Sequence, residues 1–301
     1  MIRVLVTGCR GQVGAEVARA LAGRAEVIAH DHATLDLANR DAIAARVREA
    51  HPDVIVNGAA YTAVDRAESD EAAARAVNAT GAGALAEEAR RAGALLIHYS
   101  TDYVFDGAKA APYVESDPTN PLNAYGRTKL EGERAIAASG AAHLILRTSW
   151  VYGPQGANFV RTMLRLAQTR GELRVVDDQR GAPTSSLQLA RATLELIGGA
   201  GGAITAAAVG DAKSRAGLYH AAAAGETTWF GFAQAIFEDW ARQTGATSRA
   251  PHLIAIPSSD YPTPARRPAN SRLDSSRLAA VFGVRLGPWR EALGETLSAW
   301  R

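Results

Sequence analysis

The segment Ile2-Arg3-Val4-Leu5-Val6-Thr7-Gly8-Cys9-Arg10-Gly11-Gln12-Val13-Gly14 decides the fold of this chain. A short apolar strand runs into a turn with glycines at positions 8, 11 and 14, and a helical pattern begins near residue 12. Glycines permit a tight turn and let the backbone approach a pyrophosphate, while the helix N-terminus supplies oriented N–H groups. The spacing predicts a dinucleotide-binding turn, although turns also collect glycine for purely conformational reasons.

The same alternation of strand and helix continues through the first half of the chain. Strands are expected near residues 2–7, 26–30, 53–57, 94–100 and 143–148. Helices, with apolar residues every three or four positions, are expected near 12–22, 40–50, 67–92 and 124–139. Such alternation requires crossover helices and therefore a parallel sheet. The sequence predicts an α/β fold with a Rossmann-type doubly wound sheet.

The second half is less regular. It shows a helix near 157–170, a strand near 173–177, a helix from about 185, and a glycine-alanine segment at 198–210 that we expect to be a loop or insertion. We expect residues 1–150 to form the dinucleotide-binding domain, with about 171–198 returning to it. Residues 151–170 and 217–301 are expected to form a smaller C-terminal α+β substrate-binding lobe.

Composition narrows the possible partners. The 301 residues are 47% hydrophobic, and 33 Lys plus Arg against 31 Asp plus Glu give a net charge of +2, too small to attract nucleic acid or anionic membrane. The single cysteine, Cys9, cannot form an intramolecular disulfide, which fits a reducing compartment. No stretch approaches the ~18 consecutive apolar residues of a spanning helix. We expect a cytoplasmic enzyme that acts on a small molecule.

The strongest chemical signal is Tyr125-Gly126-Arg127-Thr128-Lys129. On a helix, positions i and i+4 share a face, so the ammonium of Lys129 can lie near the phenol of Tyr125 and lower its pKa from about 10. With eight tyrosines and three lysines, this spacing is expected by chance roughly 0.08 times. The pattern favours Tyr125 as a general acid-base over a surface tyrosine beside a solvated lysine.

A hydroxyl is expected beside this pair. The run Leu95–Ser100 ends in Thr101-Asp102-Tyr103, and ligands of parallel sheets bind beyond the carboxyl ends of strands. Thr101 can therefore donate a hydrogen bond to a carbonyl group under reduction, unless it only caps the strand end. His98, on the strand itself, is interpreted as a packed core residue.

Further residues are candidates for the coenzyme site. Asp31 ends the second expected strand and can accept hydrogen bonds from an adenosine ribose, or it can cap a loop. An acid there repels a 2′-phosphate and favours NADH, but Arg10 can offset this charge and permit NADPH. Asp36 and Leu37 are placed against the adenine, and the turn Ala59-Ala60-Tyr61-Thr62 is placed along the coenzyme or is simply close-packed.

Taken together, these residues resemble the extended short-chain dehydrogenase/reductase superfamily and, within it, the family of dTDP-4-dehydrorhamnose reductases. The segments that carry the closer resemblance are Gly11–Gly14, Pro52–Asn57, Thr62–Glu68, Tyr99–Gly107, Pro121–Lys129, Arg147–Tyr152, Asp178–Thr184 and Arg267–Leu273. They are distributed over almost the whole chain.

The resemblance implies NADPH- or NADH-dependent reduction of the C4 ketone of dTDP-4-dehydro-6-deoxy-L-mannose to dTDP-L-rhamnose. It implies a catalytic trio of Thr101, Tyr125 and Lys129, and substrate contacts at Thr101, Asp102 and Trp150. The implied coenzyme contacts are Gly11, Gln12, Val13, Asp31, Asp36, Leu37, Ala60, Tyr61, Thr62, Tyr125 and Lys129, to which the turn adds Gly8 and Gly14. Arg267 and Arg272 are candidates for the substrate diphosphate, because guanidinium groups match phosphate oxygens.

Two departures and two alternatives accompany this interpretation. Some relatives form dimers around Mg²⁺; Glu16 matches one ligand, but Ser185-Ser186-Leu187 stands where a second acid is expected, so we expect no metal and either a monomer or a homodimer. Cys9-Arg10 in the turn leaves the coenzyme open. A nucleotide-sugar epimerase or 4,6-dehydratase shares the fold, and a non-catalytic reductase-like regulatory subunit is the alternative outside enzymes.

Overall fold

The computed structural model describes residues 1–244 and 250–300, and over these residues the chain is built around a six-stranded parallel sheet. The sheet order is β10-β5-β4-β3-β1-β2. Its strands are β1 (Arg3–Thr7), β2 (Glu26–His30), β3 (Val54–Asn57), β4 (Leu95–Thr101), β5 (His143–Thr148) and β10 (Gly217–His220). The five strands predicted from the first half are confirmed.

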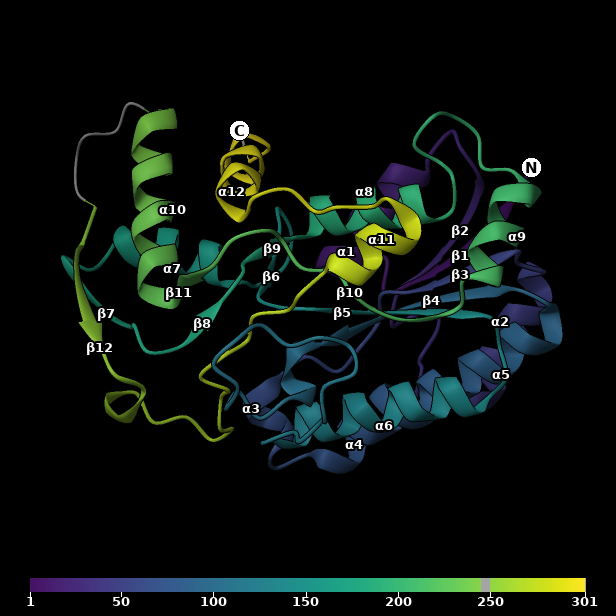
Figure 1. Cartoon of the computed structure of the whole chain (residues 1–301), viewed down its shortest axis with the longest axis horizontal. Helices are drawn as coiled ribbons and strands as arrows, with labels where there is room; N and C mark the ends of the chain where they lie inside the picture. The colour runs from purple at the N-terminus through teal and green to yellow at the C-terminus, as the bar shows by residue number, and fades with distance from the viewer. Residues whose placement is uncertain (245–249, 301) are drawn as a thin grey trace.

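Helices cover both faces of the sheet, as the doubly wound prediction requires (Figure 1). On one face lie α2 (Arg40–Ala50), α5 (Ala82–Ala92) and α6 (Ala124–Ala138), packed on Leu5, Ile55 and Leu96. On the other face lie α1 (Gln12–Leu21), α8 (Ser186–Leu196), α9 (Ala206–Ser214) and α11 (Ser276–Phe282), packed on Val4, Val6 and Ile97. Alternate residues of each strand thus face opposite layers, and both layers exclude water.

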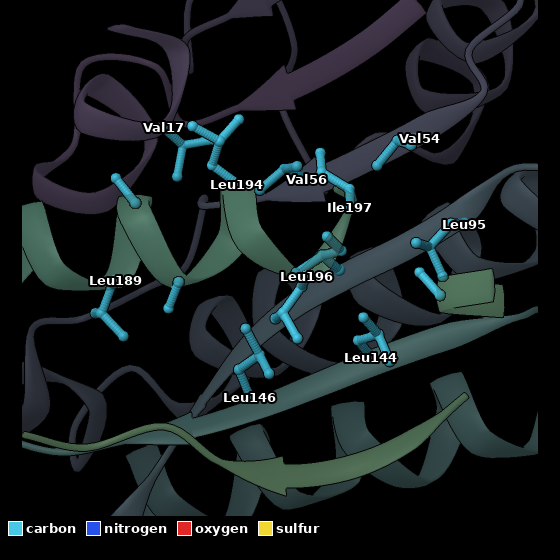
Figure 2. Packing of buried hydrophobic residues seen from close by; sticks show 14 of the residues in the cluster. Val17, Val54, Val56, Leu95, Leu144, Leu146, Leu189, Leu194, Leu196 and Ile197 are labelled. Carbon is cyan, nitrogen blue, oxygen red and sulfur yellow. The ribbon is translucent and has the colours of Figure 1, made fainter. Parts of the chain in front are cut away.

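Of residues 171–198, which were expected to return to the first domain, the helix α8 packs on the central sheet. Figure 2 shows Leu194, Leu196 and Ile197 directed onto the strands, beside Val56 and Leu144. The strand before it, β7 (Glu172–Val176), instead pairs in parallel with β12 (His252–Ile256), away from the central sheet. Only half of this segment therefore belongs to the sheet layer.

A second hydrophobic cluster forms the smaller lobe. It contains β7, β12, α7 (Phe159–Ala167), α10 (Trp229–Thr244) and α12 (Trp289–Ser298), with Phe232, Ile236 and Leu293 at its centre. Short pairs β6 (Val151–Tyr152) with β9 (Thr184–Ser185), and β8 (Arg180–Gly181) with β11 (Thr227–Thr228), connect this lobe to the sheet layer. The 3-10 helix η3 (Ser258–Asp260) follows β12.

Three expectations from the second half need correction. Residues 206–210, the end of the segment 198–210 expected to be a loop or insertion, belong instead to α9, because Val209 and Ala212 are buried in the core between the sheet and α1, α8 and α11. Residues 217–220 form β10 of the central sheet, and α11 packs on one face of that sheet. Residues 217–301 therefore do not all belong to the smaller lobe. Residues 245–249 and 301, also assigned to that lobe, lie outside the described residues.

The helix expected over 67–92 is interrupted. It is divided into α3 (Val64–Ala67), α4 (Glu71–Arg75), a π-helical turn η1 (Ala76–Gly81) and α5. The π turn brings the Asn78 carbonyl against α6, where a Cβ at Gly132 would lie 2.0 Å from that oxygen. Insertions of this kind widen one helical turn and are frequent at functional sites.

The order of the strands fixes where a ligand can bind. Chain order reverses between β1 and β3, so the turns after these two strands diverge at the carboxyl edge of the sheet. In doubly wound folds this switch point is where ligands bind. The glycine-rich turn follows β1 and the Ala59–Thr62 turn follows β3, which puts both at this edge.

Candidate active site

The predicted acid-base residues gather beyond the end of β4. Thr101 ends this strand, Asp102 begins the 3-10 helix η2 (Asp102–Val104), and Tyr125 lies in the first turn of α6. The Asn123 side chain begins α6 by accepting a hydrogen bond from Gly126 N at 2.8 Å. Gly126 lets the two segments touch, because a Cβ there would lie 2.2 Å from the Tyr103 carbonyl oxygen. The Tyr103 and Tyr125 rings meet edge to face at 5.7 Å.

Asp102 is a buried carboxyl group within this cluster. Its Oδ1 accepts a hydrogen bond from Thr101 Oγ1 at 3.1 Å, while its Oδ2 is buried without a hydrogen-bond partner among the described residues. Burial raises the pKa of Asp102 to about 7, although hydroxyl groups of Ser271 and Thr101 oppose the shift. A buried, unpartnered carboxyl oxygen at a strand end is suited to accept a hydrogen bond from a ligand.

Asp102→Asn should change the pH dependence of stability. Because the folded pKa of about 7 lies above the ordinary 3.8, the folded chain binds more protons between these pH values. The free energy of unfolding of the wild type therefore falls, relative to the variant, by about 3 kcal/mol as pH rises from 4 to 7. Chemical denaturation across this range measures the difference.

Asp117→Asn is the matched control for this prediction. A hydrogen bond from Lys109 at 2.5 Å, with further backbone and charge contributions, lowers the pKa of Asp117. Its stabilising contribution is therefore lost as pH falls, which is the opposite slope. Parallel stability curves for wild type and Asp102→Asn would contradict the assignment of Asp102 as a buried, proton-binding carboxyl.

The pKa of Tyr125 does not follow the prediction. In the ligand-free chain burial raises the pKa of this phenol above its ordinary value, the Asp102 charge raises it further, and a hydrogen bond with Thr101 opposes them. The expected lowering by Lys129 is therefore wrong for the free protein. The phenol is held protonated at neutral pH, the state that a general acid requires.

Lys129 is fully buried, one turn after Tyr125 on α6, and is held by β4. Its Nζ donates to the Tyr99 carbonyl oxygen at 2.7 Å and lies 3.1 Å from His98 Nε2. Burial lowers the pKa of Lys129 to about 8, against the opposing charge of Glu133. Glu133 is itself neutralised by a buried ion pair with Arg147 at 2.6 Å and accepts from Ser100 Oγ at 2.5 Å.

His98 is buried, as predicted, but it also contacts the lysine. The interpretation as a core residue missed this contact, although a signal was present. Positions 96 and 98 of β4 face the layer that contains α6, and Lys129 is on the buried side of that helix. Alternation along the strand therefore directs His98 toward α6.

The glycine-rich turn has the geometry expected of a pyrophosphate site. Gly8 has φ +65°, and a Cβ on Gly14 would lie 2.3 Å from the Gly8 carbonyl oxygen, so only glycine fits. Helix α1 begins after Gly11 with no side-chain cap on its N-terminal amides. Gln12 accepts a hydrogen bond from Asn158 Nδ2 at 3.1 Å, and Val13 packs against the core between the sheet and the helices α1, α8, α9 and α11. The turn can present N–H groups to an anion.

Asp31 is engaged on two sides. Its Oδ1 accepts from the backbone N and the hydroxyl of Thr34, at 3.1 and 2.9 Å, and its Oδ2 pairs with Arg10 Nε at 2.9 Å. The Thr34 hydrogen bond is the main reason that the pKa of Asp31 is lowered. Asp31 thus caps a loop, the alternative left open by the sequence, and Arg10 compensates its charge beside the glycine-rich turn.

The other residues expected to contact the coenzyme differ in how far their side chains are exposed to solvent. Asp36 is half-buried and its Oδ1 accepts from Ala38 N, whereas Leu37 is buried in the core, so any ligand contact of Leu37 would come from its main chain. Ala60 and Tyr61 are half-buried and Thr62 is exposed. The π turn holds this segment, because Asn78 accepts from Tyr61 N at 2.9 Å and donates to its carbonyl at 3.1 Å.

Trp150 is strained and covered. It is one of two non-glycine residues with positive φ in the described chain, at +49°, and its ring stacks on Trp229 with centroids 3.7 Å apart. The backbone of Gly181 also lies against the indole, since a Cβ there would be 2.5 Å from a ring carbon. Only 9% of Trp150 is exposed. The indole that was expected to pack on a sugar is therefore covered by Trp229 and by the backbone of Gly181.

The two arginines expected at a diphosphate are already paired. Arg267 forms a bidentate ion pair with Asp65, both contacts at 2.9 Å. Arg272 bonds to Glu226 at 2.6 Å and to the Ala110 carbonyl. A phosphate would have to compete with a carboxylate at each position.

Glu16 is buried on α1, where its Oε2 accepts a hydrogen bond from Arg19. Residues 185–187, where a second acidic ligand was expected, lie at the start of α8, and the Ser185 side chain caps that helix. Within residues 1–244 and 250–300, no group of three His, Cys, Asp or Glu side chains is arranged to hold a metal ion. Across the same residues, no helix is long and apolar enough to cross a membrane.

The fold and site define a class. A doubly wound parallel sheet, a glycine-rich turn at its switch point and Thr101, Tyr125 and Lys129 beyond β4 are the features of extended short-chain dehydrogenase/reductases. The family model described as "RmlD substrate binding domain" matches residues 2–301. A dTDP-4-dehydrorhamnose reductase of Burkholderia thailandensis is 49% identical over 294 residues, which cover 97% of each chain.

Solved structures agree with the sequence comparison. A dTDP-4-dehydrorhamnose reductase of Clostridium acetobutylicum superposes with a TM-score of 0.89 at 38% identity, covering 99% of each chain. One from Bacillus anthracis, in complex with NADP, also gives 0.89 at 31% identity, covering 99% of this chain and 100% of its own. The chain belongs to the dTDP-4-dehydrorhamnose reductase family.

Proposed function

We propose that this protein is an NAD(P)H-dependent oxidoreductase that reduces the C4 ketone of dTDP-4-dehydro-6-deoxy-L-mannose to dTDP-L-rhamnose. The observation that carries the proposal is the cluster of Thr101, Tyr125 and Asp102 beyond β4, with the buried Lys129 one turn after Tyr125 on α6. Family membership supports the choice of substrate, because relatives that are 49% and 46% identical over nearly the full chain are named dTDP-4-dehydrorhamnose reductase.

The residues of the chain would share the proton chemistry. Thr101 would donate a hydrogen bond to the ketone oxygen and orient it. Tyr125, whose raised pKa keeps it protonated, would deliver its proton to the oxygen as negative charge develops there. Lys129, four residues after Tyr125 on α6, would return a proton to the phenol when it is in its ammonium form. The bound nicotinamide coenzyme supplies the hydride.

The glycine-rich turn and the start of α1 would hold the pyrophosphate of the coenzyme, and Tyr61 and Thr62 would line its path. The fit is supported by Gly8 and Gly14, whose missing Cβ atoms let the turn close tightly. Arg10 neutralises Asp31, so a 2′-phosphate would not meet an isolated carboxylate. We therefore propose that NADPH and NADH are both accepted.

For the substrate, we propose that Asp102 and the edge of Trp150 contact the sugar, and that the smaller lobe formed by α7, α10, α12, β7 and β12 covers it. Arg267 and Arg272 would reach the diphosphate only by exchanging their carboxylate partners. A cytoplasmic location and a monomeric or homodimeric state complete the proposal, on the basis of the sequence.

The alternatives are less well supported. A 4,6-dehydratase uses an Asp-Glu pair directly after the threonine, whereas Tyr103 follows Asp102 here. A non-catalytic subunit has no need of a buried Lys129 one turn after a protonated Tyr125. An epimerase would return the hydride to the sugar and keep its coenzyme.

The test is a coenzyme-oxidation assay with enzymatically prepared dTDP-ketosugar, run separately with NADPH and NADH, with a UDP-linked ketosugar as the control substrate. We expect one coenzyme oxidised per sugar reduced, with the dTDP-sugar clearly preferred. Sugar conversion without net coenzyme oxidation would indicate an epimerase, and no conversion with either nucleotide would reject the reductase assignment.

A further inference from the structure

A row of buried polar side chains lies along one face of the sheet and ends at Lys129. Thr7 of β1 is registered with Asn57 of β3, and Asn57 with His98 of β4, so the three side chains share the face that packs on α6. Thr7 Oγ1 lies 2.6 Å from Asn57 Oδ1, Asn57 Nδ2 lies 2.9 Å from His98 Nδ1, and His98 Nε2 lies 3.1 Å from Lys129 Nζ. All four residues are at most 2% exposed. Water therefore does not satisfy these groups.

The orientation of the Asn57 side-chain amide is determined by its contacts with Thr7 and Ala59, on the side away from His98. The backbone N–H of Ala59 can only donate, and it points to Thr7 Oγ1 and Asn57 Oδ1, each at 3.3 Å. An oxygen rather than an NH₂ group must therefore face Ala59 and Thr7. The amide nitrogen of Asn57 is left facing His98, and it is a donor.

The proton on His98 follows from the amide. Because Asn57 Nδ2 donates to His98 Nδ1, that ring nitrogen carries no proton, and a neutral ring must carry its proton on Nε2. Burial, and then the charges of Lys129 and His143, lower the pKa of His98, which keeps the ring neutral. The Nε2–H group therefore points at Lys129 Nζ. An ammonium cannot accept this hydrogen bond, but a neutral amine can accept it and still donate to the Tyr99 carbonyl.

We propose that His98 is a positioning residue which, held as the Nε2–H tautomer by Asn57, places Lys129 and favours its neutral amine in the free protein. The other groups that face Lys129 are Glu133 of α6 and the Tyr99 carbonyl of β4, and Glu133 is balanced by Arg147 of β5. The expected effect of His98 on turnover rests on the proposed function. The tautomer of His98 can be tested independently of that function.

The experiment is ¹⁵N NMR of the full chain labelled at histidine, in the absence of coenzyme. The His98 signal is assigned by its loss in His98→Gln, and its long-range proton couplings identify the protonated ring nitrogen. We expect the Nε2–H tautomer in the wild type. The Nδ1–H tautomer would overturn the proposal, and this measurement needs no variant beyond the one used for assignment.

Asn57→Asp tests the control of the tautomer. A carboxylate at this position accepts from Nδ1–H, which leaves Nε2 free to accept from an ammonium of Lys129. The His98 ring should switch to the Nδ1–H tautomer. The ¹⁵N shift of His98 also responds to the ionisation of Lys129, and the midpoint of this response should move upward by at least one pH unit. The alkaline limb of kcat should move in the same direction.

Thr193→Val is the matched control, because it removes a buried hydroxyl that contacts Tyr99 on the opposite face of β4. It should change neither tautomer nor titration. An unchanged tautomer in Asn57→Asp would overturn the proposal. A protein with no turnover but the expected tautomer and switch would instead reject the proposed function alone.

Discussion

Tyr125→Phe should lower kcat by about 10²–10⁴-fold while leaving the dissociation constant of the coenzyme within about twofold. The substitution removes only the hydroxyl group, and the ring keeps its edge contact with Tyr103 at 5.7 Å. Without this proton the proposed general acid of the reaction is lost, and Thr101 would remain as a hydrogen-bond donor to the oxygen. Steady-state kinetics and coenzyme fluorescence titration measure the two quantities.

Tyr219→Phe is the control for this prediction. Tyr219 is also buried, and its hydroxyl donates at 2.7 Å to the carbonyl of Arg215, which precedes the amino end of β10. Loss of that hydrogen bond should cost stability, about 1 kcal/mol, with kcat unchanged. If Tyr125→Phe kept kcat within threefold of the wild type, Tyr125 would not be the acid.

Lys129→Met should lower kcat by about 10²-fold or more, and it should also change the response of stability to alkali. The folded pKa of about 8 lies below the ordinary 10.5, so the unfolded chain binds more protons between these pH values. The free energy of unfolding of the wild type should therefore rise relative to the variant by about 3 kcal/mol between pH 8 and 10.5. Denaturation curves at several pH values measure this.

Lys213→Met provides the comparison. Lys213 also donates to a backbone carbonyl, that of Gly93 at 2.6 Å, but on the protein surface. It should leave both kcat and the pH dependence unchanged. A constant difference in stability between wild type and Lys129→Met from pH 7 to 10.5 would show that the buried ammonium carries no such cost.

The first half of the fold was predictable because each element had a local signal. Strands β1 to β5 are short apolar runs, and the residues between them show helical periodicity. The second half had weaker signals. Strand β10 is four residues long and α9 has little amphipathic pattern, so only their packing against β5 and against the core between the sheet and α1, α8 and α11 reveals them.

The candidate site was predictable to a similar extent. The spacing of Tyr125 and Lys129 and the position of Thr101 after a strand placed the three on one edge, and the glycine-rich turn was recognisable from its spacing. The partners of Trp150, Arg267 and Arg272 were not, because Trp229, Asp65 and Glu226 lie 46 to 202 residues away along the chain. No local pattern encodes such contacts.

By itself, the sequence determined which elements form and which residue types stand at the ends of the strands, because hydrophobic periodicity and glycine spacing act over a few residues. The tertiary structure alone decided the electrostatics. Burial shifts the pKa of Asp102, Tyr125 and Lys129 in the direction that favours the neutral form of each group. The hydrogen-bonded row from Thr7 to His98 then determines which ring nitrogen of His98 presents a proton to Lys129. Desolvation depends on what the distant parts of the chain place around a group, and this is fixed only when the chain is folded.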